Sequence, residues 1–513
     1  MQPLRQSGPG PDTVHGVLRR HARTRPDRPF LSFLDESGAV TTISYGEMDR
    51  RAERMADLLA DRGIGPGDRF HVHLTNRPEF FDAWFGAAKA GAVMVPTNPL
   101  STAEELAHVL AHAECRLSLT QPELLTTAQV AAIDSPRCEQ LLVVGTPSLE
   151  RALATVPARP ARPEAGPATP LGVLYTSGTA GRPKGVVVPH AAYLHSGEVV
   201  ARQLRLRRED RQLIVLPLFH GNAQFYSAMS ALVSGASVAL APRFSASRWS
   251  EQAARLGATV ASLFAAPVRM ILAQRPSPHD AAHRLRAVLF AQNLTDAQLA
   301  DFEARFRVPL LQLYGMTETV APPLMNPLHG RRRNQSMGRP VAGARLRVVD
   351  ERLRDVPRGR TGELLVGGVP GRTLMAGYLR DPEATAAALG GGWLRTGDQV
   401  RVDADGFVHF VDRGRDVIKR AGENVSSSEI ERVVNAHPAV FDSAAVGVPD
   451  PIRDESVKVF VVPNGQHSLV ERELIEWCAA RLAPFKVPGC VEVVEGLPRT
   501  PVGKIRKALL RGR

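Results

Sequence analysis

The sequence predicts an α/β fold, in which a large N-terminal domain of sheets flanked by helices precedes a smaller α+β C-terminal domain. Apolar runs such as 70–76 and 92–99 alternate with helical patterns, as in open sheets covered by helices. The stretch from Gly338 to Phe410 is rich in glycine and strand-forming residues, and the pattern changes again near Asp412. The 513 residues would suit two to four domains, at about 100–200 residues each.

The elements of the large domain follow from local signals. Helices are expected at 17–25 and 45–63, because apolar residues recur at helical spacing and a proline or glycine ends each segment. A loop rich in proline and alanine, Pro157 to Pro170, is expected to join the two halves of this domain. The segment from Gly338 to Phe410 is expected to form a small barrel or meander. The segment 171–188 is predicted to form a strand, a glycine loop and a second strand. Strands that lead directly into loops are predicted at 212–225, 237–244, 287–293 and 309–319.

Residues 413–513 are predicted to form the separate small domain, after an N-terminal domain of residues 1–412. Its first helix is expected to begin at one of the serines Ser426 to Ser428, whose side chains can cap a helix. Glu429 and Glu431 are expected in the first turn, where a negative charge suits the helix dipole. The other elements expected here are strands at 440–450 and 456–463 and a helix at 469–482.

The composition restricts the partners and the compartment. A net charge of +12 would suit a nucleic-acid binder, but the basic residues are scattered and aromatic residues make up only 5%, so we expect no nucleic-acid partner. A basic surface that attracts smaller polyanions is the simpler interpretation. The sequence lacks a signal-peptide pattern and an apolar run of membrane-span length, which predicts a cytoplasmic protein without a membrane span. The four cysteines have no zinc-site or redox spacing, so we expect idle thiols.

The segment Tyr175–His190, with the sequence YTSGTAGRPKGVVVPH, is the strongest functional signal. Backbone N–H groups and hydroxyls of a loop dense in glycine, serine and threonine can surround phosphates, and a lysine adds a mobile positive charge. The loop is not a Walker loop, because Gly185 stands where a magnesium-binding serine or threonine would follow the lysine. The candidate phosphate-binding residues are Thr176, Ser177, Gly178, Thr179 and Lys184.

The whole segment resembles the phosphate loop of adenylate-forming enzymes, which include acyl-CoA synthetases, luciferases and peptide-synthetase adenylation domains. Further motifs follow in the order of that superfamily at 313–319 (LYGMTET), 393–398 (WLRTGD), 412–431 and 498–507, so the resemblance covers nearly the whole chain. It implies an ATP-dependent acyl-CoA synthetase. Such an enzyme joins a carboxylic acid to AMP with release of pyrophosphate, and then transfers the acyl group to the thiol of coenzyme A.

The resemblance implies a role for each residue of the central motifs. Attack of a carboxylate on the α-phosphate brings two anions together, so positive charge must surround them. Glu318 is expected to bind Mg²⁺, which prefers carboxylate, water and phosphate oxygens, and Thr317 is expected to bond the α-phosphate. Tyr314 and Gly315 are expected to contact adenine, and Asp398 to accept hydrogen bonds from both ribose hydroxyls.

The motifs near the C-terminus are expected to serve both half-reactions. By the resemblance, Arg413 lies near the ribose and phosphate, and Lys504 is the catalytic residue that reaches the α-phosphate and the carboxylate. The small domain is then mobile, with its hinge at Arg415. Its rotation exchanges the Lys504 loop for a loop that contains Gly422, whose small residues leave room for a slim pantetheine tunnel. Lys486 is a candidate for the CoA phosphates.

The acyl pocket is expected to follow the strand ends. The resemblance implies that His220 lies near the acyl carboxylate and the tunnel, where it could gate the entry of the thiol. No acid stands where a substrate ammonium would need a partner, which disfavours a free amino acid. Within the superfamily the chain is most similar to crotonobetaine/carnitine-type CoA ligases, and FAQNL (290–294) replaces the usual glycine-rich adenine loop. The other candidate lining residues are Asn222, Gln224, Tyr226, Phe290, Gln292 and Asn293.

Two alternatives remain open from the sequence. One is an acyl-AMP ligase that loads a separate carrier protein; the absence of a carrier domain after Lys504 favours free CoA without excluding that partner. The other is a non-catalytic nucleotide-binding or nucleic-acid-binding protein, which the intact Lys184, Glu318, Asp398 and Lys504 argue against. A homodimer is also compatible with the sequence, and the carboxylic acid itself is not specified.

Overall fold

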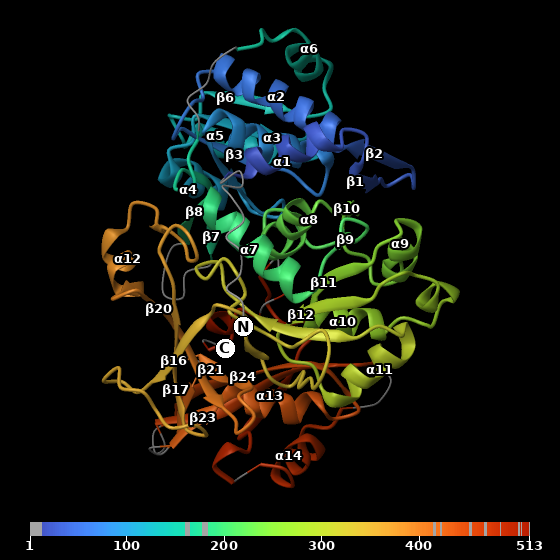
Figure 1. Cartoon of the computed structure of the whole chain (residues 1–513). Helices are drawn as coiled ribbons and strands as arrows, with labels where there is room; N and C mark the ends of the chain where they lie inside the picture. The colour runs from blue at the N-terminus through green and yellow to red at the C-terminus, as the bar shows by residue number, and fades with distance from the viewer. Residues whose placement is uncertain are drawn as a thin grey trace, which may run out of the picture.

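The structure is a computed structural model that describes residues 13–159, 165–176, 183–413, 417–420, 423–450, 454–465, 469–482, 484–500, 503 and 505–511. Within these residues, three sheets form the N-terminal domain and a fourth forms the C-terminal domain. Figure 1 shows the N-terminal elements at the top and the C-terminal helices packed below the yellow and green segments. The predicted α/β fold with a large and a small domain is confirmed. Among the helices within the described ranges, none combines the length and hydropathy that a membrane span requires.

The largest sheet has, among the described residues, nine strands in the order β15-β14-β13-β12-β11-β9-β10-β1-β2. The run from β13 to β1 is parallel, and the outer strands β2, β14 and β15 are antiparallel to their neighbours. Its strands are β1 (Pro29–Leu34), β2 (Val40–Ser44), β9 (Arg211–Ile214), β10 (Ser237–Leu240), β11 (Val260–Phe264), β12 (Ala287–Ala291), β13 (Leu310–Tyr314), β14 (Leu324–Met325) and β15 (Arg339–Pro340).

Alternate residues of this sheet belong to different cores, as the two-residue period of a strand requires. On β12, Val288 and Phe290 pack beneath α9 (Trp249–Arg255), α10 (Ala265–Leu272) and α11 (Asp296–Phe306). Ala287 and Leu289 face the opposite core, which also contains residues of several other N-terminal helices. The helices that contribute to that core are α1 (Val14–Thr24), α2 (Tyr45–Asp61), α3 (Pro78–Ala90), α6 (Pro147–Thr155), α7 (His190–Gln203) and α8 (Met229–Ser234).

The second sheet has the order β18-β8-β7-β4-β3-β5-β6 within the described residues. The predicted strand–loop–strand around the glycine-rich segment is confirmed, because β7 (Pro170–Thr176) pairs antiparallel with β8 (Lys184–Pro189). Residues 177–182 between them lie outside the described residues. The other elements are β3 (Arg69–His73), β4 (Val93–Pro96), β5 (Leu117–Thr120), β6 (Gln140–Val143), β18 (Gly377–Tyr378), α4 (Ala103–Ala113) and α5 (Leu125–Ile133).

The expected barrel-like segment is a small antiparallel sheet. Its last strand pairs with β20, and the chain enters the C-terminal sheet between Arg413 and Val417, so the change of sheet falls beside the expected boundary. Its elements are β16 (Arg345–Val349), β17 (Thr361–Gly367), α12 (Pro382–Ala388), β19 (Leu389–Gly390), β20 (Trp393–Val402) and β21 (Val408–Arg413).

Among the described residues, the C-terminal domain packs two helices on a sheet that is antiparallel except for its final strand, around a core of its own that includes Ile430, Val459 and Leu474. Ser426 caps α13 by accepting a hydrogen bond from the Glu429 N–H, as the sequence predicts. Its elements are β22 (Val417–Arg420), β23 (Glu423–Ser426), α13 (Ser427–Asn435), β24 (Val440–Asp450), β25 (Asp454–Pro463), α14 (Glu471–Ala479) and β26 (Cys490–Val493).

Candidate active site

The loop after β13 brings two predicted nucleotide-binding residues into direct contact. The Tyr314 hydroxyl donates a hydrogen bond of 2.5 Å to Oδ2 of Asp398, which lies buried in β20. Asp398 also donates its own backbone N–H to the Thr396 hydroxyl at 3.1 Å. β21 pairs the backbone of Arg413 with that of Asp398, so Arg413 stands on the neighbouring strand. Residues from three separate motifs therefore meet at one place.

A second set of contacts links the glycine-rich segment to the loop after β13. The Tyr378 hydroxyl donates to Oε1 of Glu318 at 3.0 Å, and Nζ of Lys184 lies 4.9 Å from the centre of the Tyr378 ring. Asp381 places a carboxylate oxygen 4.0 Å from the same ammonium. Burial, together with the negative charge of Glu318, raises the pKa of Tyr378, so its phenol stays a donor. Lys184 and Glu318 thus contact one aromatic side chain, the lysine at the ring and the glutamate at the hydroxyl.

Tyr378 and Asp381 are functional candidates that the sequence analysis missed. Tyr378 is placed by backbone pairing, because it stands opposite Val186 in β8, and the Leu379 N–H donates to the Gly185 carbonyl at 2.7 Å. The available signal was an aromatic residue just before a helix start, since Asp381 caps α12. That signal specifies where the helix begins, but it does not indicate that the Tyr378 side chain contacts Lys184 and Glu318.

The turn that presents Thr317 and Glu318 is held from within. The Thr319 hydroxyl accepts the Met316 N–H at 3.1 Å and donates to the Met316 carbonyl at 2.9 Å. Val320 follows with a φ of +55°, a left-handed conformation that costs a β-branched residue about 1–2 kcal/mol. The Ser196 hydroxyl donates to its carbonyl at 3.2 Å, and the valine is fully buried. Surrounding contacts therefore impose a strained turn beside the candidate site.

Glu318 is a suitable single carboxylate for a cation that brings its other ligands with it. Its side chain is buried, and its Oε1 accepts a hydrogen bond from Tyr378. In the described part of the chain no three histidine, cysteine, aspartate or glutamate side chains gather as a metal site. Mg²⁺ is commonly bound by one or two carboxylates plus waters and substrate phosphates, which fits this donor set.

Tyr226 meets the central motif at Gly315. A Cβ atom added to Gly315 would lie 2.2 Å from the Tyr226 hydroxyl oxygen, so no other residue fits without displacement. Burial raises the pKa of Tyr226, which keeps the phenol neutral. Tyr226 belongs to a π-helix, η2 (Asn222–Ala228), where a loop was expected; π-helical turns are frequent at functional sites.

The other predicted pocket residues of this π-helix face different surroundings. His220 lies edge-on to Phe264 with ring centres 5.5 Å apart, and its Nδ1 accepts the Asn222 N–H at 3.1 Å. Oδ1 of the buried Asn222 has no hydrogen-bond partner among the described residues. Gln224 accepts from the Tyr193 hydroxyl and donates to the Leu218 carbonyl, so its amide is occupied inside the protein. Asn222 is therefore the better placed of the two amides for a ligand.

The loop after β12 has a glycine-like backbone without a glycine. Gln292 has a φ of +78°, and its carbonyl accepts a hydrogen bond from the Gln312 side chain at 3.0 Å. The next carbonyl, that of Asn293, accepts from the Arg269 guanidinium at 3.2 Å. Phe290 is fully buried beneath the helices of this sheet, so its predicted place in the pocket wall gains no support.

The structure describes only some of the residues that the C-terminal motifs are expected to contribute to the two half-reactions. Lys486 pairs with Glu429 at 2.7 Å, so any contact with CoA phosphates would share that ion pair. Gly503, one residue before Lys504, lies against the N-terminal domain, since a Cβ added to it would be 3.7 Å from that of Ala266. The predicted residues that lie outside the described residues are Ser177, Gly178, Thr179, Arg415, Gly422 and Lys504.

Comparison with known proteins agrees with this arrangement of motifs. The family model described as AMP-binding enzyme matches residues 18–379, and that of the AMP-binding enzyme C-terminal domain matches residues 429–504. The chain is 37% identical over 499 residues to a crotonobetaine/carnitine–CoA ligase of Salmonella agona, covering 94% of this chain and 96% of the relative. It is 38% identical over 492 residues to the enzyme so named in Citrobacter koseri, covering 94% and 95%.

Solved structures of similar proteins include further CoA ligases. An anthranilate CoA ligase in complex with anthranoyl-AMP superposes with a TM-score of 0.90 at 26% identity, covering 98% of this chain and 97% of that one. A benzoate CoA ligase from Burkholderia xenovorans LB400 gives a TM-score of 0.89 at 26% identity, covering 97% and 99%. The predicted class of activity, an AMP-forming acid–thiol ligase, is confirmed by these relatives. The chain belongs to the AMP-binding enzyme family.

Proposed function

We propose that the protein is an acyl-CoA synthetase that works in two steps. In the first, a carboxylate oxygen of the acid attacks the α-phosphate of ATP, an O–P bond forms, and pyrophosphate leaves. In the second, the CoA thiol loses its proton and attacks the acyl carbon, a C–S bond forms, and AMP leaves. The observation that supports this most directly is the convergence of Tyr314 with Asp398 and of Glu318 with Lys184 around one loop.

The nucleoside is assigned to the Tyr314–Asp398 pair. A carboxylate has two oxygens and several acceptor directions, so Asp398 can keep the Tyr314 hydroxyl and still accept from both ribose hydroxyls. Its burial makes those hydrogen bonds stronger than in water. Because the tyrosine hydroxyl is fixed by this bond, the ring is held in one orientation for adenine stacking.

The phosphates are assigned to Lys184 and Glu318. We expect Glu318 to hold the Mg²⁺ that arrives with ATP, which would neutralise phosphate charge while the carboxylate approaches. Lys184 sits over the Tyr378 ring, and its ammonium is half-exposed, so it is able to turn toward a phosphate. Thr317 lies in the same turn as Glu318, within reach of the same ligand. Lys504 is proposed to neutralise the charge that develops at the reacting carboxylate and phosphate.

The acid and the acceptor are separate questions. The relatives named crotonobetaine/carnitine–CoA ligases favour a polar acid of that kind as the first substrate to test. The buried Asn222 side chain, whose oxygen has no hydrogen-bond partner among the described residues, offers an acceptor for a hydroxyl or an amide N–H of such an acid. Transfer to a separate carrier protein is the second candidate for the acceptor, because the adenylate-forming step is the same.

Pyrophosphate release measured across a panel of acids tests the first step. The panel contains crotonobetaine, carnitine, benzoate, anthranilate, and short, long and polycyclic acids, each with and without CoA. We expect at least one acid to give pyrophosphate, and mass spectrometry to detect the corresponding acyl-CoA. If the acyl group is transferred only to a phosphopantetheinylated carrier protein, that carrier replaces CoA as the acceptor. If none of the acids gives pyrophosphate, the proposed function is refuted. The Lys504→Ala variant is expected to lose adenylate formation by about 10²–10³-fold, as for other positioned charges.

A further inference from the structure

A buried aspartate at the interface of the two domains is shared by two arginines. Asp442 lies in β24 of the C-terminal domain and is only 2% exposed. Its Oδ2 pairs with Arg499 of the same domain and, at 3.3 Å, with Arg269 of α10 in the N-terminal domain. Its Oδ1 accepts the Ser443 N–H at 2.9 Å, which fixes the carboxylate. One acid therefore joins the two domains through two guanidinium groups.

The electrostatics of this cluster favour a single docked arrangement. Arg269 is 9% exposed, and burial lowers its pKa to about 10; burial and the nearby charge of Arg269 lower the pKa of Arg499 to about 10. Both arginines remain charged at neutral pH. Removing a partner from a buried ion pair is costly because the remaining charge is left uncompensated. A small displacement of the domains would do this to Arg269, because the two acids that act on it, Asp442 and Glu431, both belong to the C-terminal domain. Its hydrogen bond to the Asn293 carbonyl would remain.

Arg499 connects the cluster to the segment that contains Lys504. Its Nη1 donates to the Gly503 carbonyl at 2.5 Å, while its backbone pairs with that of Ile505. The Gly503 N–H closes the turn on the Thr500 carbonyl at 2.8 Å. A single guanidinium thus spans the stem and the tip of this turn, and the tip rests beside Ala266, at the start of the helix that holds Arg269.

We propose that Arg269, Asp442 and Arg499 form an interdomain clamp that positions the Lys504 segment for adenylate formation. The clamp rests on the proposed two-step function, and its members are positioning residues, since they act through the segment they hold. It is specific to the first step, because the thiol-transfer step proceeds from an adenylate already made. The three residues lie far apart in the sequence, in α10, in β24 and beside the C-terminal turn, so no local sequence pattern indicates that they meet.

The test separates the two half-reactions in the full-length protein. Arg269→Met is the main variant, because it leaves Asp442 and Arg499 as a balanced pair within one domain. We expect its adenylate formation, measured by pyrophosphate release, to fall about 10- to 100-fold, the scale of a displacement of roughly 1 Å. Thiol transfer from a supplied, synthetic acyl-adenylate should be unchanged. Arg269→Lys keeps the charge without the planar fork and should give an intermediate loss in the first step.

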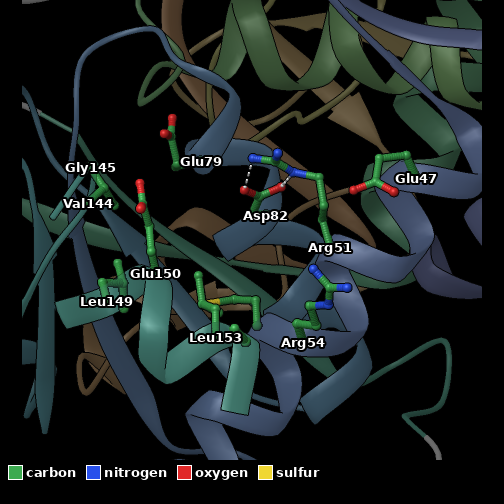
Figure 2. Close-up of a pocket in the computed structure, with 12 residues that line it drawn as sticks. Glu47, Arg51, Arg54, Glu79, Asp82, Val144, Gly145, Leu149, Glu150 and Leu153 are labelled. Atoms are coloured by element: carbon green, nitrogen blue, oxygen red, sulfur yellow. Dashed lines mark hydrogen bonds and ion pairs between the residues drawn. The ribbon is translucent and has the colours of Figure 1, made fainter. Parts of the chain in front are cut away.

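A control comes from a second arginine–aspartate pair, which is partly buried, at the far end of the N-terminal domain. Figure 2 shows Arg51 and Asp82 in a pocket of about 280 Å³ between α2, α3 and α6, joined by hydrogen bonds of 2.8 and 2.6 Å. Arg51→Met removes a comparable ion pair without touching the domain interface. We expect it to lower stability while leaving the ratio of the two half-reaction rates at its wild-type value.

Amide hydrogen exchange gives a readout that needs no substrate. The clamp predicts faster exchange in α10 and in residues 505–511 of Arg269→Met, and wild-type exchange there in Arg51→Met. Equal slowing of both half-reactions in Arg269→Met, or wild-type rates in both, would overturn the clamp. A wild-type protein that makes no adenylate from any acid would refute the proposed function instead, and the exchange comparison would still decide whether the clamp holds the domains.

Discussion

Gly315 offers the sharpest test of how the candidate nucleotide site is built. Gly315→Ala would place a Cβ atom 2.2 Å from the Tyr226 hydroxyl oxygen and 3.4 Å from Pro322 Cα, whereas ordinary contacts begin near 3.4 Å. The tyrosine or the motif loop must therefore move by about 1 Å, a displacement that costs on the order of 10²-fold in rate when it reaches the reacting groups. Overpacking of this kind also lowers the free energy of unfolding by about 1–3 kcal/mol.

The second variant, Tyr226→Phe, removes the clashing oxygen. The next nearest atom of that ring is Cζ at 3.4 Å, so the double variant should recover most of the lost adenylate formation and stability. Pyrophosphate release and chemical unfolding of all four proteins form a double-mutant cycle, in which we expect a coupling of at least about 1 kcal/mol. Gly390→Ala, an exposed glycine with no atom within 4 Å of the added Cβ, is the control and should be neutral. Equal losses from Gly315→Ala with and without the Tyr226 hydroxyl would refute the reasoning.

Three further predictions test separate features. Tyr378→Phe removes the hydroxyl that donates a hydrogen bond to Glu318 and should slow adenylate formation about tenfold. Thiol transfer from a supplied acyl-adenylate should be unchanged, which is the check. Burial lowers the pKa of His73 to about 4, so as the pH falls the unfolded chain takes up this proton before the folded protein does. The free energy of unfolding should therefore decrease as the pH drops below 6.5, by about 2 kcal/mol at pH 5. Urea unfolding of His73→Leu at both pH values should lack this histidine's share of the decrease. The double variant Ala266→Cys and Gly503→Cys, in which the exposed Cys490 is also changed to Ser, should form a disulfide, because the Cβ separation of 3.7 Å suits the bond. The disulfide should block thiol transfer until it is reduced. An uncrosslinked product on non-reducing gels would contradict the docked position.

Features set by neighbouring residues were predictable from the sequence. The Ser426 cap, the helix at Tyr45–Asp61 and the strand pair around the glycine-rich segment depend on spacing and capping within a few residues. Glu431 shows the limit of such signals: it lies beyond the first turn, where it accepts the Ala445 N–H from β24 and pairs with Lys507. The prediction that Glu431 lies in the first turn is therefore wrong, and its partners come from distant segments that a capping signal does not reveal.

The acyl pocket was less predictable because it depends on which face of an element is buried. Phe290 and Gln292 are two residues apart, yet one lies in the helix-covered core and the other in a left-handed loop. The π-helix that holds Tyr226 and Gln224 turns one toward Gly315 and the other toward Tyr193. A single extra residue per turn decides which side chain faces the site, whereas the sequence predicted a strand that leads into a loop here and no helix.

The replacement of the expected glycine-rich loop by FAQNL has a structural explanation. Gln292 keeps the left-handed backbone at a cost of about 1–2 kcal/mol, so the loop path survives the loss of glycine. Two side chains hold that path: Gln312 donates to the Gln292 carbonyl, and Arg269 donates to the Asn293 carbonyl. Because Arg269 also binds Asp442, docking of the C-terminal domain and the geometry of this loop share one guanidinium. Undocking would leave both loop contacts in place but would remove Asp442, the second group that fixes the Arg269 guanidinium, so the loop should be most rigid while the adenylate forms.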